Sequence, residues 1–150
     1  MREWRRWAAE GRLEVGTRFR FSRTFTSDDV EAFGQLTRDD NPVHSEALWY
    51  EAKGFREPLC HGLLVGSMLC DPGGQVGWLA TGMSFRFLKP TYVGDTVTCE
   101  MTIVEVDEKG FARAEAVLST QRGDVVVTGE LTGFVPVDGE RELLRDLIEE

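Results

Sequence analysis

The segment over residues 59–70 constrains the fold most, because apolar side chains occupy nearly every face of it. It reads Leu-Cys-His-Gly-Leu-Leu-Val-Gly-Ser-Met-Leu-Cys. A helix that is apolar all round belongs inside a fold and not on its surface. The sequence Asp71-Pro72-Gly73-Gly74 follows directly and predicts that this helix ends there. The rest of the chain therefore has to surround one buried helix.

The period of the apolar residues changes to two after this segment. Alternation runs over residues 97–103, 112–118 and 125–135, and turn-forming residues at 107–110 and 121–124 separate these strands as hairpins. Residues 17–25 and 77–90 supply two further strands. The pattern predicts an α+β fold with an antiparallel sheet wrapped around the buried helix. Unpaired sheet edges favour a dimer, either alone or as a dimer of dimers.

Helical signals come between the first strand and the apolar segment. Residues 26–29 (Thr-Ser-Asp-Asp) predict a helix start, and Pro42 cannot continue that helix, so residues 38–44 should form a turn. Ser45 is then expected to cap a second short helix that runs through Lys53 and ends at Gly54.

Length, charge and cysteine content exclude several classes of protein. The 150 residues fit a single domain over 1–150, with a core of about 12–136 and charged extensions at both ends. A net charge of −9 argues against nucleic acid or an anionic membrane as partner, and no apolar run of about 18 residues predicts a membrane span. Three scattered cysteines and no apolar leader indicate a reduced, cytoplasmic protein.

The two ends are highly charged. Residues 1–12 hold four Arg and two Glu, and residues 138–150 hold six acidic residues and two Arg. We favour solvated helical or frayed segments at both ends. The alternative is that each forms a small amphipathic helix, the first through Trp4 and Trp7, that docks on the body or on a partner.

The candidate for chemistry is Asp39-Asp40-Asn41-Pro42-Val43-His44. Pro42 stiffens this turn, so the Asp39 carboxylate and the His44 imidazole can converge on one water as a general acid–base pair. The same residues also suit a plain helix-ending turn, in which His44 merely hydrogen-bonds the backbone.

A second candidate is His61-Gly62, at the start of the apolar helix. A helix N-terminus presents free N–H groups that can polarise a carbonyl oxygen. Equally, Gly62 can serve tight packing while His61 caps the helix.

The sequence lacks the motifs of several other kinds of site: zinc-ligand spacing, a nucleophile elbow, a phosphate loop and a dinucleotide fingerprint. Cys60 beside His61 is more typical of a buried apolar residue than of a nucleophile.

Three motifs in order resemble the MaoC-like dehydratases, the (R)-specific enoyl-CoA hydratases with a hot-dog fold. Residues 33–44 (Phe-Gly-Gln-Leu-Thr-Arg-Asp-Asp-Asn-Pro-Val-His) look like the hydratase signature. Residues 57–64 are similar to the His-Gly start of the family's central helix, and residues 85–97 to the following strand and its Gly-Asp turn.

This resemblance implies (R)-specific hydration of a trans-2-enoyl-CoA to the (R)-3-hydroxyacyl-CoA, or the reverse dehydration. Asp39 and His44 match the pair that activates the water, and Gly62 matches the N–H that binds the thioester carbonyl. The candidates for contact with the substrate are Asn41, Pro42, His61, Cys70, Arg86 and Lys89. No metal or redox cofactor is implied, since CoA or pantetheine is part of the substrate.

Two departures from the family pattern stand out. Arg38 precedes Asp39 where the family usually has a small residue, often Gly. Cys70 stands where a serine assists the site, so that role is dispensable, weakened or taken over by Ser67. Arg56, Arg86 and Lys89 are candidates for the phosphates of the substrate, with ordinary surface charges as the alternative. For the acyl tail the candidates are Leu63, Leu64, Met68 and Trp78, although core packing is the favoured role of these four.

Two other functions remain open at this stage. A hot-dog acyl-CoA thioesterase shares the fold and the thioester site but hydrolyses the thioester. A non-catalytic module would bind an acyl thioester without turning it over, although the Asp39 and His44 pair has no use in a pure binder.

Overall fold

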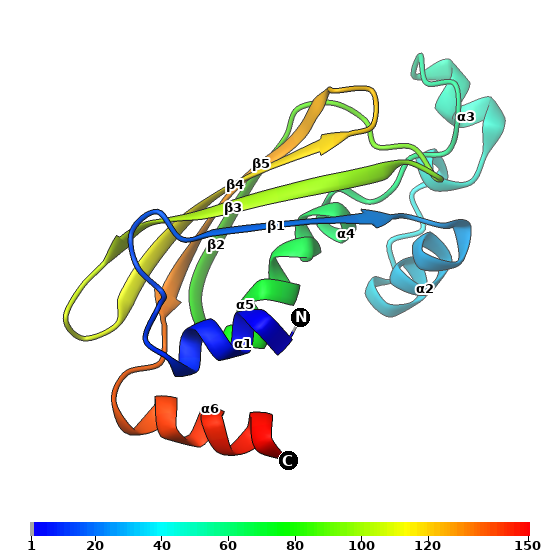
Figure 1. Ribbon diagram of the computed structural model, residues 1–150. Coiled ribbons are helices and arrows are strands. Elements are labelled where there is room, and N and C mark those ends of the chain that lie inside the picture. Colours follow the sequence, from blue (N-terminus) through cyan, green and yellow to red (C-terminus); the bar gives the residue numbers. More distant parts are fainter. Residues whose placement is uncertain (1) are drawn as a thin grey trace.

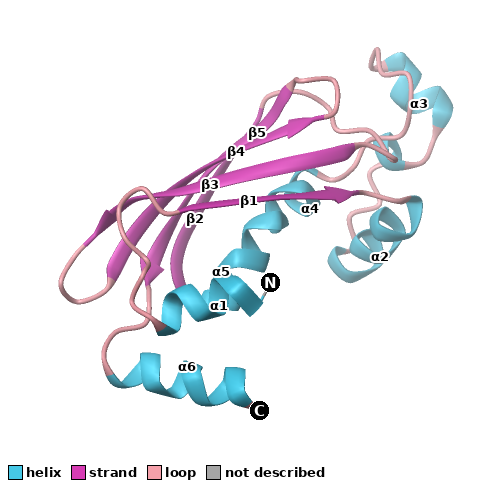
Figure 2. Ribbon diagram, in the orientation of Figure 1, coloured by secondary structure: helices cyan, strands magenta, loops and turns pink. Residues whose placement is uncertain are grey.

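A five-stranded antiparallel sheet is the framework of the computed structural model, which describes residues 2–150 (Figure 1). The strands lie in the order β1-β3-β4-β5-β2, so β1 and β2 form the two edges. Their bounds are β1 Arg18–Thr24, β2 Leu79–Phe87, β3 Thr96–Val106, β4 Phe111–Thr120 and β5 Val125–Phe134. The sheet curves over a helical segment, as Figure 2 shows by element type. The predicted strands and the predicted sheet-around-helix arrangement are confirmed.

Alternation of side chains puts the core on one face of the sheet. In β3 the side chains of Val97, Cys99, Met101 and Ile103 are fully buried. They lie beside the small residues of β4, with Met101 opposite Ala116 and Ile103 opposite Ala114. The expected parity fails at the start of β5, where Val126 and Val127 are both buried because the β4–β5 register shifts there.

The buried helix is longer than its sequence predicts. It consists of α4 (Gly62–Gly66), the 3-10 turn η2 (Ser67–Leu69) and α5 (Cys70–Val76), which follow one another without a break. The predicted end at Asp71-Pro72-Gly73-Gly74 is wrong, because the helix ends at Gly77, whose φ is +72°. Pro72 is tolerated because it falls in the first turn of α5, directly after the 3-10 turn.

Two glycines let this helix approach the sheet. A Cβ atom at Gly62 would lie 2.8 Å from the ring of Phe87, and one at Gly66 would lie 3.0 Å from the ring of Phe85. Any larger residue at either position would push the helix away from β2. The same contacts show that Phe85 and Phe87 face the helix.

The helical segment before the buried helix is largely as predicted. Helix α2 (Ser27–Thr37) begins with a capping box, in which Thr26 Oγ1 accepts from the Asp29 N–H and the Asp29 carboxylate accepts from the Thr26 N–H. The 3-10 turn η1 (Pro42–His44) and α3 (Ala47–Ala52) follow. The prediction that Ser45 caps α3 is wrong, because Glu46 is the N-cap residue and makes no side-chain cap.

Both chain ends form helices. The favoured interpretation of solvated or frayed segments is wrong for the first end, which buries Trp4 and Ala8, whereas the second end is a largely solvated helix without a buried residue, as that interpretation allowed. Helix α1 (Arg2–Ala9) and helix α6 (Gly139–Glu149) lie together below the sheet (Figure 1). Trp4 is 93% buried against Phe19, with ring centroids 5.6 Å apart. The Arg145 guanidinium donates to the carbonyl of Ala9, which joins α6 to α1.

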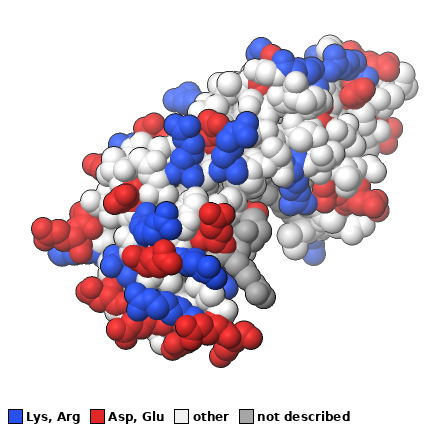
Figure 3. Space-filling view, viewed as in Figure 1, with Lys and Arg blue, Asp and Glu red and all other residues white. Residues whose placement is uncertain are grey.

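Charged side chains are interspersed over the face shown in Figure 3, with acidic ones concentrated around α6. Over residues 2–150, no helix has both the length and the apolar character that crossing a bilayer requires.

A buried carboxylate fixes the loop that borders the candidate site. Asp95 is 4% exposed and accepts two hydrogen bonds from the Arg122 guanidinium, at 2.7 and 2.8 Å. Gln121 Nε2 and the Tyr92 N–H donate to the same carboxylate. Burial by itself would raise the pKa of Asp95, but the hydrogen bonds from Arg122, Gln121 and Tyr92 hold it below its ordinary value. This network joins residues 92–95 to the β4–β5 turn.

We expect Asp95→Asn to lower the free energy of unfolding at pH 7 by about 3 kcal/mol, because it leaves a charged Arg122 without its partner. The folded-state pKa of Asp95 is depressed, so its stabilising contribution is present above the unfolded value of 3.8 and is lost as the pH falls through the folded value. The difference between wild type and variant should therefore shrink in acid. Urea unfolding at pH 7 and pH 3 measures this.

Glu100→Gln is the matched control, because the side chain of Glu100 is 44% exposed where it pairs with Arg20. It should change stability by less than about 1 kcal/mol. If the free energies of unfolding of wild type and Asp95→Asn differ by the same amount at pH 7 and pH 3, this explanation of the role of Asp95 is contradicted.

Candidate active site

The turn after α2 is built by its own polar side chains. Asp39 Oδ1 accepts from the Asn41 N–H at 3.1 Å, and Asn41 Oδ1 accepts from the Val43 N–H at 3.0 Å. Pro42 then opens the 3-10 turn that carries His44. The interpretation as a helix-ending turn is thus correct, and the same turn brings the His44 side chain back toward Asp39.

The backbone explains the family's preference for a small residue before Asp39. Arg38 ends α2 in the left-handed region, with φ 61° and ψ 25°. Glycine reaches this region without a steric penalty, whereas a residue with a Cβ is strained there by about 1 kcal/mol. Arg38 takes the same backbone path as glycine, and its side chain is exposed.

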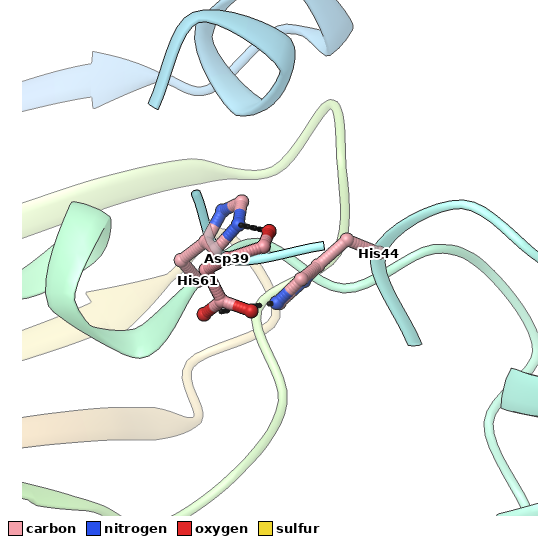
Figure 4. Close-up of side chains that lie close together, drawn as sticks. All are labelled: Asp39, His44 and His61. Carbon is pink, nitrogen blue, oxygen red and sulfur yellow. Dashed lines mark hydrogen bonds and ion pairs between the residues drawn. The ribbon is translucent and has the colours of Figure 1, made fainter. Parts of the chain in front are cut away.

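Asp39 and His44 face each other across a short gap (Figure 4). His44 Nε2 lies 3.8 Å from Asp39 Oδ2. On the other side of the ring, His44 Nδ1 lies 2.7 Å from the carbonyl oxygen of Leu59. Because a carbonyl only accepts, Nδ1 carries the hydrogen, and Nε2 of the neutral ring is a free acceptor directed at Asp39.

This geometry suits a bound water better than a direct hydrogen bond. At 3.8 Å the two acceptor atoms are too far apart for a direct bond, and neither has a hydrogen to donate while His44 is neutral. A water placed between them can donate one hydrogen to Asp39 Oδ2 and the other to His44 Nε2. The pair is therefore arranged to hold a water and to take a proton from it.

His61 lies against both members of the pair. Its Nε2 is 3.3 Å from the main-chain oxygen of Asp39, and its ring stacks on that of His44 with centroids 3.7 Å apart. Phe33 contacts the imidazole as well, at 5.0 Å between centroids. Burial lowers the pKa of His61. His61 is the N-cap residue of the central helix, as the alternative interpretation has it, but its side chain makes no capping hydrogen bond.

These residues border a pocket of about 510 Å³. Its wall comes from α2, from the turn after α2 and from the two loops that contain Leu59 and Tyr92. An isolated β-bridge between Leu59 and Tyr92 joins these two loops. The lining residues are Ser27, Val30, Glu31, Gly34, Gln35, Asp39, Asp40, Asn41, His44, Ser45, Pro58, His61 and Val93. Asp39 and His44 thus open onto a space large enough for the reacting part of a substrate.

Gly62 begins the central helix directly after His61, and its contact with Phe87 shows that it serves tight packing. As the first residue of a helix, it also has an N–H without a helical acceptor. The two interpretations of Gly62 are compatible. Burial raises the pKa of the Cys60 thiol to about 12, which agrees with a structural role for this residue and not a nucleophilic one.

Three other predicted residues lie away from this pocket. Cys70 lines separate hollows further along the helix. Arg86 points to the opposite face of the sheet from Phe85 and Phe87, and Lys89 pairs with Asp124 at 3.1 Å. Contact of these three residues with the substrate stays a prediction. Ser67 donates its hydroxyl hydrogen to the carbonyl of Leu64, so this hydrogen is already in use.

Asp39, His44 and His61 are also the side chains that could hold a metal ion. One ligand atom from each lies within 4.8 Å of the others. A metal bound there would occupy His44 Nε2, the atom that the proton-transfer role requires free. The absence of a metal from the reaction stays a prediction.

Comparison with known proteins places this site in a family. The sequence model described as "MaoC like domain" matches residues 10–125, which is more than half of the chain. The chain belongs to the MaoC-like domain family. The family match covers residues 10–125, so α1, α6 and nearly all of β5 lie outside it.

Individual relatives agree with this assignment. An (R)-specific enoyl-CoA hydratase of Aeromonas caviae is 34% identical over 83% of this chain and 96% of its own length. A mitochondrial 3-hydroxyacyl-[acyl-carrier-protein] dehydratase of Solanum lycopersicum is 29% identical over 86% of this chain and 81% of its own. The solved structure of an A. caviae (R)-hydratase involved in PHA biosynthesis matches with a TM-score of 0.78 and 35% identity, covering 83% and 98% of the two chains. The predicted hot-dog fold is confirmed.

The sequence missed how closely His61 contacts the candidate acid–base pair, Asp39 and His44. It also missed the Leu59 carbonyl, which sets the tautomer of His44. Pairing of His61 with the turn has no signal in the spacing, because 22 residues separate it from Asp39. A main-chain carbonyl is present at every residue, so no residue type marks the one that His44 selects.

Proposed function

We propose that this chain is a hydro-lyase, which adds water to a trans-2-enoyl-CoA to form the (R)-3-hydroxyacyl-CoA or catalyses the reverse dehydration. The observation that carries the proposal is the 3.8 Å gap between two proton acceptors, Asp39 Oδ2 and His44 Nε2, at the edge of a pocket. Membership of the MaoC-like family and the similarity to an (R)-specific enoyl-CoA hydratase support it.

The reaction follows from the positions of these groups. Water held between Asp39 and His44 loses a proton to one of them as its oxygen bonds to C3 of the enoyl group. Negative charge then develops on the thioester oxygen, where the Gly62 N–H at the start of the central helix would stabilise it. The proton returned to C2 completes the hydration, and the atoms balance without a metal or a redox cofactor.

Asp39→Asn and His44→Ala should each lower kcat/KM for crotonyl-CoA by about 10²–10⁴-fold, because the neutral amide of asparagine is not basic enough to take a proton and alanine removes the imidazole altogether. Loss of the enoyl-thioester ultraviolet absorbance measures this hydration. Asp28→Asn is the matched control, since it removes an exposed carboxylate on α2 that does not line the pocket. Full activity after dialysis against EDTA is expected as well.

Two other outcomes would replace the proposal. Release of CoA from a saturated acyl-CoA, without hydration of any enoyl-CoA, would identify a thioesterase. Binding of acyl thioesters without turnover would identify a non-catalytic module. The chirality of the product, determined on the same samples, tests the (R) assignment.

The acyl tail would run along the central helix toward a second hollow. This hollow measures about 200 Å³ and is lined mainly by apolar side chains and glycine: Leu69, Cys70, Gly73, Gly74, Trp78, Ala80, Met83 and Leu131. Gly73 is buried, yet a Cβ at this position would meet no atom within 4 Å. Glycine is therefore needed neither for packing nor for an unusual φ, and its effect is to leave space beside the helix.

Gly73→Leu should fill this hollow and select against long substrates. We expect kcat/KM for trans-2-octenoyl-CoA to fall by about tenfold or more, with crotonyl-CoA affected much less. Leucine has the higher helix propensity, so a loss through unfolding is not expected, and thermal denaturation checks this. An equal loss for both substrates would mean that the acyl tail does not reach Gly73.

The phosphates of the substrate would need local cations on a protein of net charge −9. Arg86 and Lys89 stay candidates for this contact, with free CoA or a carrier-bound pantetheine as the donor of the acyl group. A cytoplasmic location and the lack of nucleic-acid or membrane partners also stay predictions.

We also propose a homodimer formed through the β2 edge of the sheet. Strand β2 lies at this edge, and apolar side chains remain exposed along it and just beyond, at Leu79, Met83, Phe87 and Leu88. An exposed edge strand offers free N–H and C=O groups to another strand, and a second copy can supply one by two-fold symmetry.

Met83→Arg should dissociate this dimer, because it puts a charge into the apolar part of the edge. Sedimentation velocity at micromolar concentration measures the change. Leu147→Arg is the matched control, since Leu147 is a 54% exposed apolar residue on α6 and is not part of the sheet. Dissociation by Leu147→Arg alone would place the interface on α6.

A further inference from the structure

His61 is the most buried polar side chain at the candidate site, with 3% exposure. It touches both residues of the proposed acid–base pair, through its hydrogen bond to the main chain of Asp39 and through its stack on the ring of His44. The proposed mechanism uses neither of its nitrogen atoms. Such a residue needs an explanation, because burial of an imidazole carries a desolvation penalty.

The hydrogen bonds fix the tautomer of His61. Its Nε2 faces a carbonyl oxygen, that of Asp39, so Nε2 carries the hydrogen. Its Nδ1 is then a bare acceptor, and among residues 2–150 no donor or acceptor lies within hydrogen-bonding reach of it. A second proton on Nδ1 would have no acceptor and would put a charge in a buried position beside the ring of His44.

His61 and His44 therefore have opposite tautomers at a separation of 3.7 Å between ring centroids. His44 carries its hydrogen on Nδ1, bonded to Leu59, and keeps Nε2 free. His61 carries its hydrogen on Nε2 and has no acceptor for another. Only one of the two stacked rings is thus equipped to take a proton from water, although both line the same pocket.

We propose that His61 is a permanently neutral positioning residue, which holds the main chain of Asp39 with its N–H and the ring plane of His44 with its face. This proposal rests on the proposed hydratase function for its kinetic consequence. Phe33 contacts the His61 ring from α2, so His61 is itself held in place. The 3.8 Å gap that receives the water depends on this contact chain from Phe33 through His61 to Asp39 and His44.

The groups around His61 act in both directions. Burial and the neighbouring His44 lower the pKa of His61, whereas the hydrogen bond to Asp39 and the Asp39 carboxylate, which lies within 4.8 Å, raise it, and burial prevails. Asp39 presents its main-chain oxygen to His61, while the nearest Asp39 carboxylate oxygen is directed at His44 (Figure 4). The other titratable neighbour is His44, whose protonation during the reaction would repel a second positive charge. Phe33 contributes an apolar ring. No group packed against His61 presents an acceptor to Nδ1.

Nitrogen-15 spectra of the two histidine rings test the charge and the tautomer directly. The chain has only His44 and His61, so labelling with ¹⁵N-histidine produces two ring systems, which His44→Ala assigns. We expect His61 to show the Nε2–H tautomer and His44 the Nδ1–H tautomer at pH 7.5. His61 should show no protonation down to pH 5.5. Protonation of His61 near pH 6.5, the ordinary value of the side chain, would overturn the proposal.

Two variants separate the two contacts of His61. His61→Gln keeps an N–H that can reach Asp39 but removes the ring, whereas His61→Phe keeps the ring face but removes the donor. We expect each to lower kcat for crotonyl-CoA by about 10- to 100-fold with little change in KM, since the substrate still binds but the water is misplaced. Full kcat in both variants, or a rise in KM alone, would overturn the positioning role.

Folding is monitored by thermal denaturation and by the His44 ring signals. If one of the two variants, His61→Gln or His61→Phe, fails to fold, the other is used. The ¹⁵N spectra of the wild type show whether His61 is neutral without the use of either variant. Absence of hydration by the wild type would reject the proposed function. It would leave the tautomer and charge of His61 to be decided by the spectra alone.

Discussion

The close packing of the central helix on the sheet is the constraint on which the rest of the structure depends. Gly62 and Gly66 remove the side chains that would hold the helix away from Phe87 and Phe85. The start of the helix is thereby fixed beneath the sheet, and His61 and the Gly62 N–H are fixed with it. Without this contact, His61 and the Gly62 N–H would no longer be held in place at the candidate site. None of the four residues that make the contact is proposed to exchange a proton.

The site is assembled by main-chain carbonyls as much as by side chains. Leu59 accepts from His44 and so leaves Nε2 free, while Asp39 accepts from His61 and so leaves the other ring with its hydrogen on Nε2. Two chemically identical side chains acquire different capacities from the carbonyl that each one meets. The loop that carries Leu59 is paired with Tyr92, and Tyr92 is joined to the buried Asp95 and Arg122 pair. An ion pair remote from the reaction thus supports the tautomer of His44.

Helices α1 and α6 pack together at the two charged chain ends. Charge alone indicated solvated ends, but Trp4 enters the core and α6 lies on α1. The favoured prediction failed for α1 because it considered the charged residues alone, whereas burial of one indole outweighs the exposure of several charged groups. It held for α6, which is a helix with no buried residue. A helix with Trp at positions three apart can keep its charges in water and still bury one face.

Local chemistry made much of the architecture readable from the sequence. The all-apolar segment required burial, strict alternation required strands, and the Asp-x-Asn-Pro-x-His turn placed a carboxylate and an imidazole close together. Boundaries were less accurate, as the continuation of the helix through Pro72 to Val76 shows, because a preceding 3-10 turn removes the usual penalty for proline.

By itself, the sequence determined the fold class and the buried helix and predicted Asp39 and His44 as the candidate pair, since each depends on residue type and short-range spacing. Only the tertiary structure decided that the gap between them is 3.8 Å, that His61 stacks on His44, and that Arg86 lies on the far face of the sheet. These features join residues that are distant in the chain, through main-chain atoms and packing. The types of the residues in a sequence say little about such contacts.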